Sequence, residues 1–139
     1  MTAKEYLGQA YRLDQRINSK LEQVMSLRDL ATKATSTLSD VAPSGTRNVH
    51  RMEDIIVKII DLENEINRDI DNLVDLKREM VSVIKAVSNT ELQTLLELRY
   101  LCFKTWEQIA VIMGYDLRYI HKLHNRAVEE CKINGVIGH

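Results

Sequence analysis

The sequence predicts an all-α protein in which a long antiparallel coiled-coil hairpin precedes a three-helix module. Three observations support this prediction. The chain of 139 residues contains one proline and five glycines, so few residues break helices. Apolar residues recur at alternating steps of three and four over most of residues 1–87, which is typical of coiled coils. Residues 105–128 have the spacing of a helix-turn-helix.

The expected organisation is a hairpin over residues 1–87, a helical module over residues 88–133 and a flexible tail over residues 134–139. The two long helices are expected to be joined by a loop at Val41 to Val49. Lys20 interrupts the apolar repeat of the first helix, and Asp69 interrupts that of the second. The repeating positions are Tyr6, Ala10, Leu13, Ile17, Val24, Leu27, Ala31, Ala34, Leu38 and Val41 in the first helix, and Met52, Ile55, Ile59, Leu62, Ile66, Leu73, Leu76, Met80, Val83 and Val87 in the second.

The two interruptions predict that the long helices pair antiparallel within one chain. A parallel pair of second helices would bring Asp69 against its own copy in a desolvated seam. When residues are matched so that their numbers sum to 93, Ala31 meets Leu62, and Lys20 comes within reach of Asp69. The flanking charges also pair in this register: Asp14 with Lys77, Arg28 with Glu63, and Arg16 with Glu79.

A second apolar stripe runs beside the predicted seam, and it includes Tyr11 and Met25. Apolar patches of this size usually mark an interface. We therefore expect self-association into a helical bundle of two hairpins. The residues expected at that interface are Leu7, Leu21, Ile56, Ile60, Ile70, Val74, Val81 and Ile84. The alternative is that the C-terminal module folds back over part of the stripe.

Capping patterns mark the helices of the C-terminal module. Ser88 to Glu91 has the pattern of a capping box, which predicts a helix over Thr90 to Leu101. Thr105 to Gln108 is a second capping box, at the start of the next helix. The expected core of the module consists of Leu95, Leu98, Trp106, Ile109, Ile120 and Leu123. Trp106 is expected in this core rather than in contact with a nucleic-acid base.

The last helix of the motif is expected to separate an apolar face from a polar one. Gly114 lies where the turn favours positive φ, and Asp116 is a suitable N-cap. The apolar positions are Ile120, Leu123 and Ala127. The opposite face can donate hydrogen bonds to phosphates and base edges. The candidate DNA-binding residues are Asp116, Arg118, Tyr119, His121, Lys122, Asn125 and Arg126.

This module resembles region four of bacterial sigma factors, over roughly residues 90–131. The matching residues are Leu98, Arg99, Tyr100, Thr105, Glu107, Ile109, Ala110, Met113, Gly114, Arg126 and Ala127. The size and layout are similar to those of small regulators encoded by phages of Gram-positive hosts. The resemblance implies a helix that reads promoter DNA and a contact with RNA polymerase. The sequence departs from the family at Leu117, where a polar residue usually opens the recognition helix.

Composition and charge exclude several classes of protein. The net charge of -1 predicts modest DNA affinity for each module, because Lys and Arg supply most non-specific affinity. Cys102 and Cys131 are too few for a disulfide framework, and there is no signal peptide or long apolar run, so we expect a cytoplasmic protein without membrane contact. These cysteines and the pair His121 and His124 lack the spacing of a zinc site, so we expect no metal.

The sequence therefore predicts a dimeric, sequence-specific DNA-binding transcriptional regulator that binds double-stranded DNA. No nucleophile motif or phosphate loop is present, so we expect no enzyme activity and no cofactor. Two alternatives stay open. One is the small subunit of a phage DNA-packaging terminase, which would assemble as a ring. The other is a protein-only adapter that has lost DNA binding.

Overall fold

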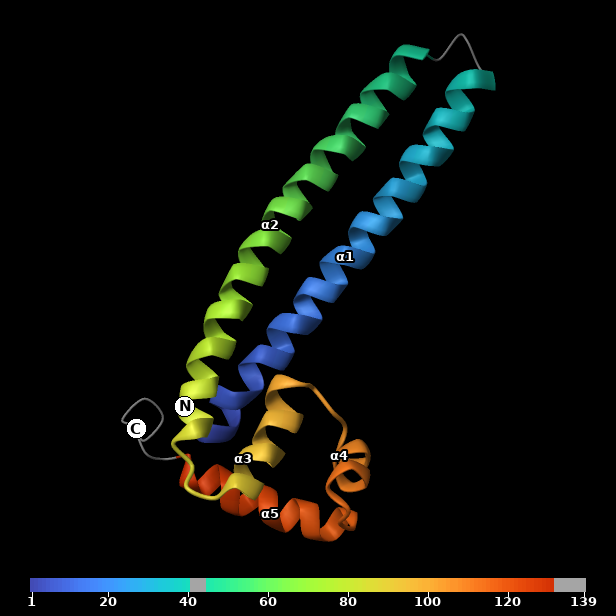
Figure 1. Ribbon diagram of the computed structural model, residues 1–139. Helices are drawn as coiled ribbons and strands as arrows, with labels where there is room; N and C mark the ends of the chain where they lie inside the picture. The colour runs from blue at the N-terminus through green and yellow to red at the C-terminus, as the bar shows by residue number, and fades with distance from the viewer. Residues whose placement is uncertain (41–44, 132–139) are drawn as a thin grey trace. The chain divides into compact units, whose positions relative to one another are not determined.

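The computed structural model describes residues 1–40 and 45–131, with backbone only for residues 36–40 and 45–48. These residues form an all-α structure, as the sequence predicts. The helices are α1 (Ala3–Asp40), α2 (Gly45–Lys85), α3 (Thr90–Leu96), the π-helix η2 (Glu97–Leu101), α4 (Trp106–Met113) and α5 (Leu117–Glu130) (Figure 1). No helix in the described ranges has the length and apolar character needed to cross a membrane.

The second long helix begins earlier than the sequence predicts. α2 starts at Gly45, so the expectation that residues 45–49 belong to a loop was wrong. Glycine and asparagine each lower helix propensity by about 1 kcal/mol or less, which the strongly patterned helix that follows overrides. Residues 41–44 of the expected loop, like the expected tail, lie outside the described residues.

The chain divides into two compact units, and unit 2 (Gln15–Asn72) consists of parts of α1 and α2. Within it the two helices lie side by side and run in opposite directions (Figure 1). Among the side chains that are described there, the seam buries Ile17, Val24, Ile55 and Ile66 of the apolar repeat. Arg28 Nη2 lies 3.1 Å from Glu63 Oε2, as the predicted register requires.

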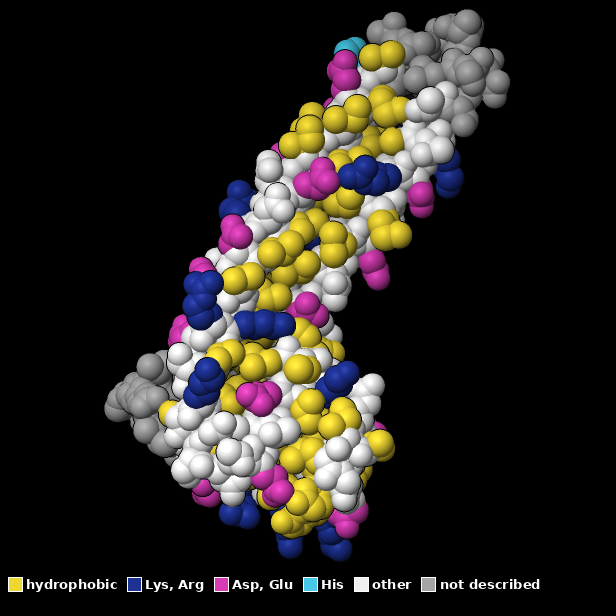
Figure 2. Space-filling view, viewed as in Figure 1, with side chains coloured by type: hydrophobic (Ala, Val, Ile, Leu, Met, Phe, Trp, Pro, Cys, Tyr) yellow, Lys and Arg dark blue, Asp and Glu magenta, His cyan; other side chains and the backbone are white. Residues whose placement is uncertain are grey.

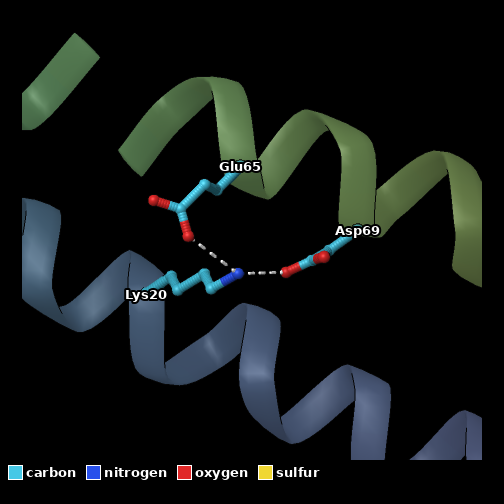
Figure 3. Close-up of polar contacts among 3 residues, drawn as sticks. All are labelled: Lys20, Glu65 and Asp69. Atoms are coloured by element: carbon cyan, nitrogen blue, oxygen red, sulfur yellow. Dashed lines mark hydrogen bonds and ion pairs between the residues drawn. The ribbon is translucent and has the colours of Figure 1, made fainter. Parts of the chain in front are cut away.

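A charged cluster replaces one apolar layer of the seam in unit 2 (Figure 3). Lys20 Nζ donates to Asp69 Oδ2 at 2.6 Å, which confirms the predicted contact, and lies 3.3 Å from Glu65 Oε1. The Lys20 and Asp69 side chains are only 13% and 16% exposed. The hydrogen bond with Asp69 raises the pKa of Lys20. A slipped register would leave one of these charges unpaired in a half-buried seam, so the cluster favours the observed alignment.

Unit 1 combines Met1–Asp14 with the chain from Leu73 onward. Its core is shared between the long helices and the C-terminal helices. The fully buried large side chains come from both parts: Leu7, Met80, Ile84, Val87, Leu92, Leu95, Leu96, Ile109, Ile120 and Leu123. The domain boundary expected after Val87 therefore lies inside unit 1, because the three short helices alone are too small to bury all of their apolar faces.

Two residues expected at an intermolecular interface lie in this core instead. Leu7 and Ile84 are buried within unit 1, so the expectation that they contact a second chain was wrong. The C-terminal helices cover them, which is the alternative that the sequence left open. Val81 is half-buried. The remaining residues expected at the interface, which are Leu21, Ile56, Ile60, Ile70 and Val74, are between 42% and 51% exposed.

The start of α3 also differs from the prediction. Asn89, and not Ser88, is the N-cap, and its side-chain oxygen accepts the N–H groups of Glu91 at 2.8 Å and Leu92 at 3.3 Å. Asparagine is at least as favourable an N-cap as serine, so the neighbouring residue takes the role. Ser88 Oγ lies 3.4 Å from Glu130 Oε2 instead. The predicted extent of Thr90 to Leu101 is confirmed, with its last turn wound as η2.

Candidate nucleic-acid interface

The turn between α4 and α5 has the backbone that its sequence predicts. Gly114 has a φ of 74°, in the left-handed region that favours glycine. The N–H groups of Gly114 and Tyr115 both donate to the carbonyl oxygen of Ala110, at 3.0 and 3.1 Å. At the start of α4, Thr105 and Gln108 form both hydrogen bonds of the predicted capping box. Both ends of α4 are therefore fixed by local hydrogen bonds.

One face of α5 is buried against the rest of unit 1. Ile120, Leu123 and Ala127 are buried, as predicted, and His124 joins them. α5 packs against both α3 and α4. This packing fixes the rotation of α5 about its own axis, so the opposite face is presented to solvent in one orientation.

The solvent face of α5 carries the candidate contact residues. Arg118, His121, Lys122, Asn125 and Arg126 are all exposed. Arg118, Lys122 and Arg126 follow each other at four-residue steps, so their side chains lie along one side of about two helical turns. The face therefore presents a row of basic side chains, with the ring nitrogens of His121 and the amide of Asn125 beside it.

Asp116 and Tyr119 take more structural roles than the other candidates. The Asp116 carboxylate caps α5 by accepting the N–H of Tyr119 at 2.8 Å. The Tyr119 ring is partly exposed and packs edge-on against Tyr115, with ring centres 4.7 Å apart. Tyr115 turns inward, and its hydroxyl donates to Glu91 Oε2 at 2.6 Å. The Tyr115 and Asp116 contacts thus position the first turn of α5.

Trp106 lies at the centre of a packed cluster. The guanidinium carbon of Arg99 lies 4.2 Å from the centre of the indole ring. The rings of His121 and His124 lie 4.8 Å and 4.7 Å from it, centre to centre. Trp106 is half-buried and packs against the core of unit 1, which agrees with the predicted core position. Arg99 Nη1 also donates to the carbonyl oxygen of Lys104 at 3.0 Å, so η2 is tied to the start of the motif.

A buried polar pair underlies α5. The hydroxyl of Tyr100 lies 2.6 Å from His124 Nε2. Burial lowers the pKa of His124 to about 4, and it raises the pKa of Tyr100 to about 12. Both groups are therefore neutral at physiological pH, with one hydrogen bond between them. The spacing of His121 and His124 argues against a zinc site, but it does not predict that His124 is buried. In the described part of the chain no group of three or more His, Cys, Asp or Glu could hold a metal ion.

Two further features escaped the sequence analysis. Phe103 has a φ of 57°, which is strained for a bulky residue. Lys77 holds the adjoining turn, because its Nζ donates to the carbonyl oxygen of Leu101 at 3.1 Å and lies 4.6 Å from the centre of the Phe103 ring. On α4, Val111 is 82% exposed and Ile112 is 55% exposed. The run of five apolar residues at 109–113 could have indicated this, since a helix cannot bury them all on one side.

The comparisons with known proteins identify a family but not an activity. A family model described as "Protein of unknown function (DUF1492)" matches residues 32–132. The matched segment spans the end of α1 and all of α2, α3, η2, α4 and α5. No curated protein and no solved structure matches the chain.

Proposed function

The chain belongs to the DUF1492 family, and we propose that it is a sequence-specific DNA-binding transcriptional regulator. One observation carries the proposal. α5 is fixed on one side by Ile120, Leu123 and Ala127, and on the other side it presents a row of exposed hydrogen-bond donors. A helix with a fixed rotation and a donor-rich solvent face is what a major groove accepts.

The roles of the individual side chains follow from their positions on α5. Arg118 and Lys122 lie in the first half of the helix, the part that contacts base edges in helix-turn-helix proteins. Either can donate to the O6 and N7 atoms of guanine. Arg126 lies one turn further on and is the better candidate for a backbone phosphate. Asp116 acts as the N-cap of α5: its carboxylate accepts the N–H of Tyr119 and so holds the first turn of the helix in place.

The proposed regulator has macromolecular partners and acts in the cytoplasm. The partner is double-stranded DNA, and the similarity to sigma region four adds RNA polymerase as a second partner. In this proposal the chain acts by binding alone, without a cofactor or a catalysed reaction, in the cytoplasm. It also forms a homodimer, which is supported by the exposed apolar residues Leu21, Ile56, Ile60 and Ile70 of unit 2.

Selection of bound fragments from a pool of random duplex DNA tests this function. We expect enrichment of a short sequence, with affinity that falls steeply as salt rises because phosphate contacts release counterions. A variant with Arg118→Ala and Lys122→Ala should lose the enrichment. A matched variant with Lys58→Ala and Arg78→Ala removes two exposed cations from α2 and should retain it. Absence of any enrichment by the wild-type protein would overturn the proposal.

A protein-only adapter is the second candidate, and a specific observation favours it. Val111 and Ile112 are exposed on α4, and Leu117 is 40% exposed at the start of α5. These side chains suit an apolar partner better than they suit a phosphate backbone. The terminase alternative predicts a ring of many chains, which a measurement of native mass would detect.

A further inference from the structure

One face of α2 carries a symmetric pattern of exposed residues. Ile56, Ile60, Glu63, Asn67 and Ile70 are all exposed, and they recur at steps of four, three, four and three. Such steps keep residues on a single side of a helix. Ile56 and Ile60 lie on one side of a polar centre formed by Glu63 and Asn67, and Ile70 and Val74 lie on the other side, so the pattern reads the same in both directions around residue 65.

This face borders a groove along the helix pair of unit 2. The groove has a volume of about 570 Å³, and among its lining residues are Leu21, Met25 and Ile66. Figure 2 shows hydrophobic side chains running along unit 2, crossed by a few charged side chains. A second groove on the same helix pair is lined mainly by polar residues, including Ser19, Gln23 and Asp61. The groove at Leu21 and Met25 is therefore the more apolar of the two, and exposed apolar surface of this kind usually marks an interface.

We propose that the apolar groove is filled by a second copy of this chain, whose α2 runs antiparallel to the first across a two-fold axis near Glu65. Paired residues then have numbers that sum to 130. Ile60 of each copy faces Ile70 of the other, and helix spacing places Ile56 opposite Val74. At the centre, Glu63 of each copy accepts a hydrogen bond from the Asn67 amide of the other.

The charges at the centre distinguish this pairing from a parallel one. A parallel pair of α2 helices would set Glu63 against Glu63, a like-charge contact at an interface. In the antiparallel pair, Glu63 meets Asn67 instead. Arg28 already lies 3.1 Å from Glu63 of its own chain, so each copy brings a neutral ion pair to the axis. The face is thus complementary to itself in its residue pattern and its charges, as an isologous interface requires.

The pairing rests on the proposed self-association, and both can be tested without DNA. Sedimentation should give twice the chain mass of 16.0 kDa for the wild-type protein. Ile70→Lys should sediment at the mass of one chain at the same concentration. Gln23→Lys introduces the same charge at the polar groove and should remain a dimer. Circular dichroism should show unchanged helical content in both variants.

Crosslinking then tests the direction of the pairing. In a Cys102→Ser background, the remaining Cys131 is buried, and burial raises its thiol pKa to about 11, so it reacts slowly. With a short bis-maleimide, the Ile60→Cys variant alone and the Ile70→Cys variant alone should each give little crosslinked dimer. A mixture of the two variants should give abundant crosslinked dimer, because residue 60 of one copy faces residue 70 of the other. Efficient crosslinking of each variant with itself would overturn the antiparallel pairing and leave self-association standing. A monomeric wild-type protein, or a ring of many chains, would overturn both.

Discussion

The Tyr100 hydroxyl lies 2.6 Å from His124 Nε2, and both side chains are buried in the core of unit 1. This pair joins η2 to α5 through a buried hydrogen bond. A buried donor or acceptor costs about 1–3 kcal/mol when its partner is removed. The pair therefore ties η2 to α5 as long as both partners are present.

The stability of the protein should fall as pH falls, because of His124. Its pKa is about 4 in the folded protein and 6.5 in the unfolded chain, so below pH 6.5 the unfolded chain binds a proton that the folded protein does not. The contribution is fully present above pH 6.5 and is lost between pH 6.5 and 4. We expect a loss of about 3 kcal/mol across that window, measured by urea unfolding at several pH values.

Two histidine variants test whether His124 is the group that causes this pH dependence. His124→Gln keeps a polar side chain but cannot titrate, so its free energy of unfolding should vary less with pH than that of the wild type. His121→Gln changes an exposed histidine on the same helix whose charge makes the smallest contribution to the lowered His124 pKa, so it should keep most of the wild-type pH dependence. Equal pH profiles for wild type and His124→Gln would show that another group is responsible.

The sequence was most informative where charge and spacing agreed. Lys20 and Asp69 interrupt two regular repeats, and only an antiparallel register lets them meet, so their contact was predictable from the pattern. The N-cap of Asp116 and the positive φ of Gly114 were predictable for a similar reason, since each depends on local geometry alone.

The features that were missed depend on tertiary packing. An apolar repeat shows that Leu7 and Ile84 are buried, but it does not show whether a second chain or the same chain covers them. His124 lies four residues after Ile120, on the same buried face of α5. Because histidine is polar, the apolar pattern of the helix did not include it in the predicted core. The strain at Phe103 arises from the path of the chain between η2 and α4, which no local pattern specifies.

The seam of unit 2 should depend on both members of its central ion pair. Lys20→Met leaves Asp69 and Glu65 near each other without a cation, so we expect a loss of up to about 3 kcal/mol in the free energy of unfolding. The double variant Lys20→Leu with Asp69→Leu should recover that loss, because an apolar layer needs no charge pairing. Urea unfolding measures both variants.

An exposed pair elsewhere on α2 provides the control. Arg78→Met removes the cation from a pair with Asp75 whose side chains are 78% and 75% exposed, and exposed pairs contribute about 0–1 kcal/mol. A cost for Lys20→Met that is no larger than the cost for Arg78→Met would mean that the half-buried seam does not depend on its charges.

Gly114 should be the most sensitive backbone position of the motif. A Cβ added there would have no heavy atom within 4 Å, so a substitution meets no steric obstacle from its neighbours. The cost comes from the φ of 74° alone, and it should be about 1–2 kcal/mol for Gly114→Ala. Gly114→Asn should cost less, since asparagine tolerates this region better. Thermal unfolding compares the two variants, and equal losses would point to a cause other than φ.

The last prediction separates the roles of the cations on α5. Arg118→Ala or Lys122→Ala, if either side chain contacts a base, should weaken binding to the preferred site by about 1–3 kcal/mol and relax selectivity there. Arg126→Ala should weaken binding to all sequences alike and make the dependence on salt shallower, because it removes a phosphate contact. Fluorescence anisotropy with preferred and scrambled duplexes at several salt concentrations measures both effects.

These three side chains are exposed and lie outside the core of unit 1, so each variant should keep the helical content and unfolding behaviour of the wild type. That control separates a loss of contact from a loss of fold. If the preferred duplex is bound by Arg118→Ala, Lys122→Ala and Arg126→Ala as tightly as by the wild type, α5 does not read DNA. The exposed Val111 and Ile112 on α4 would then become the surface to test first, with an apolar protein partner in place of a groove.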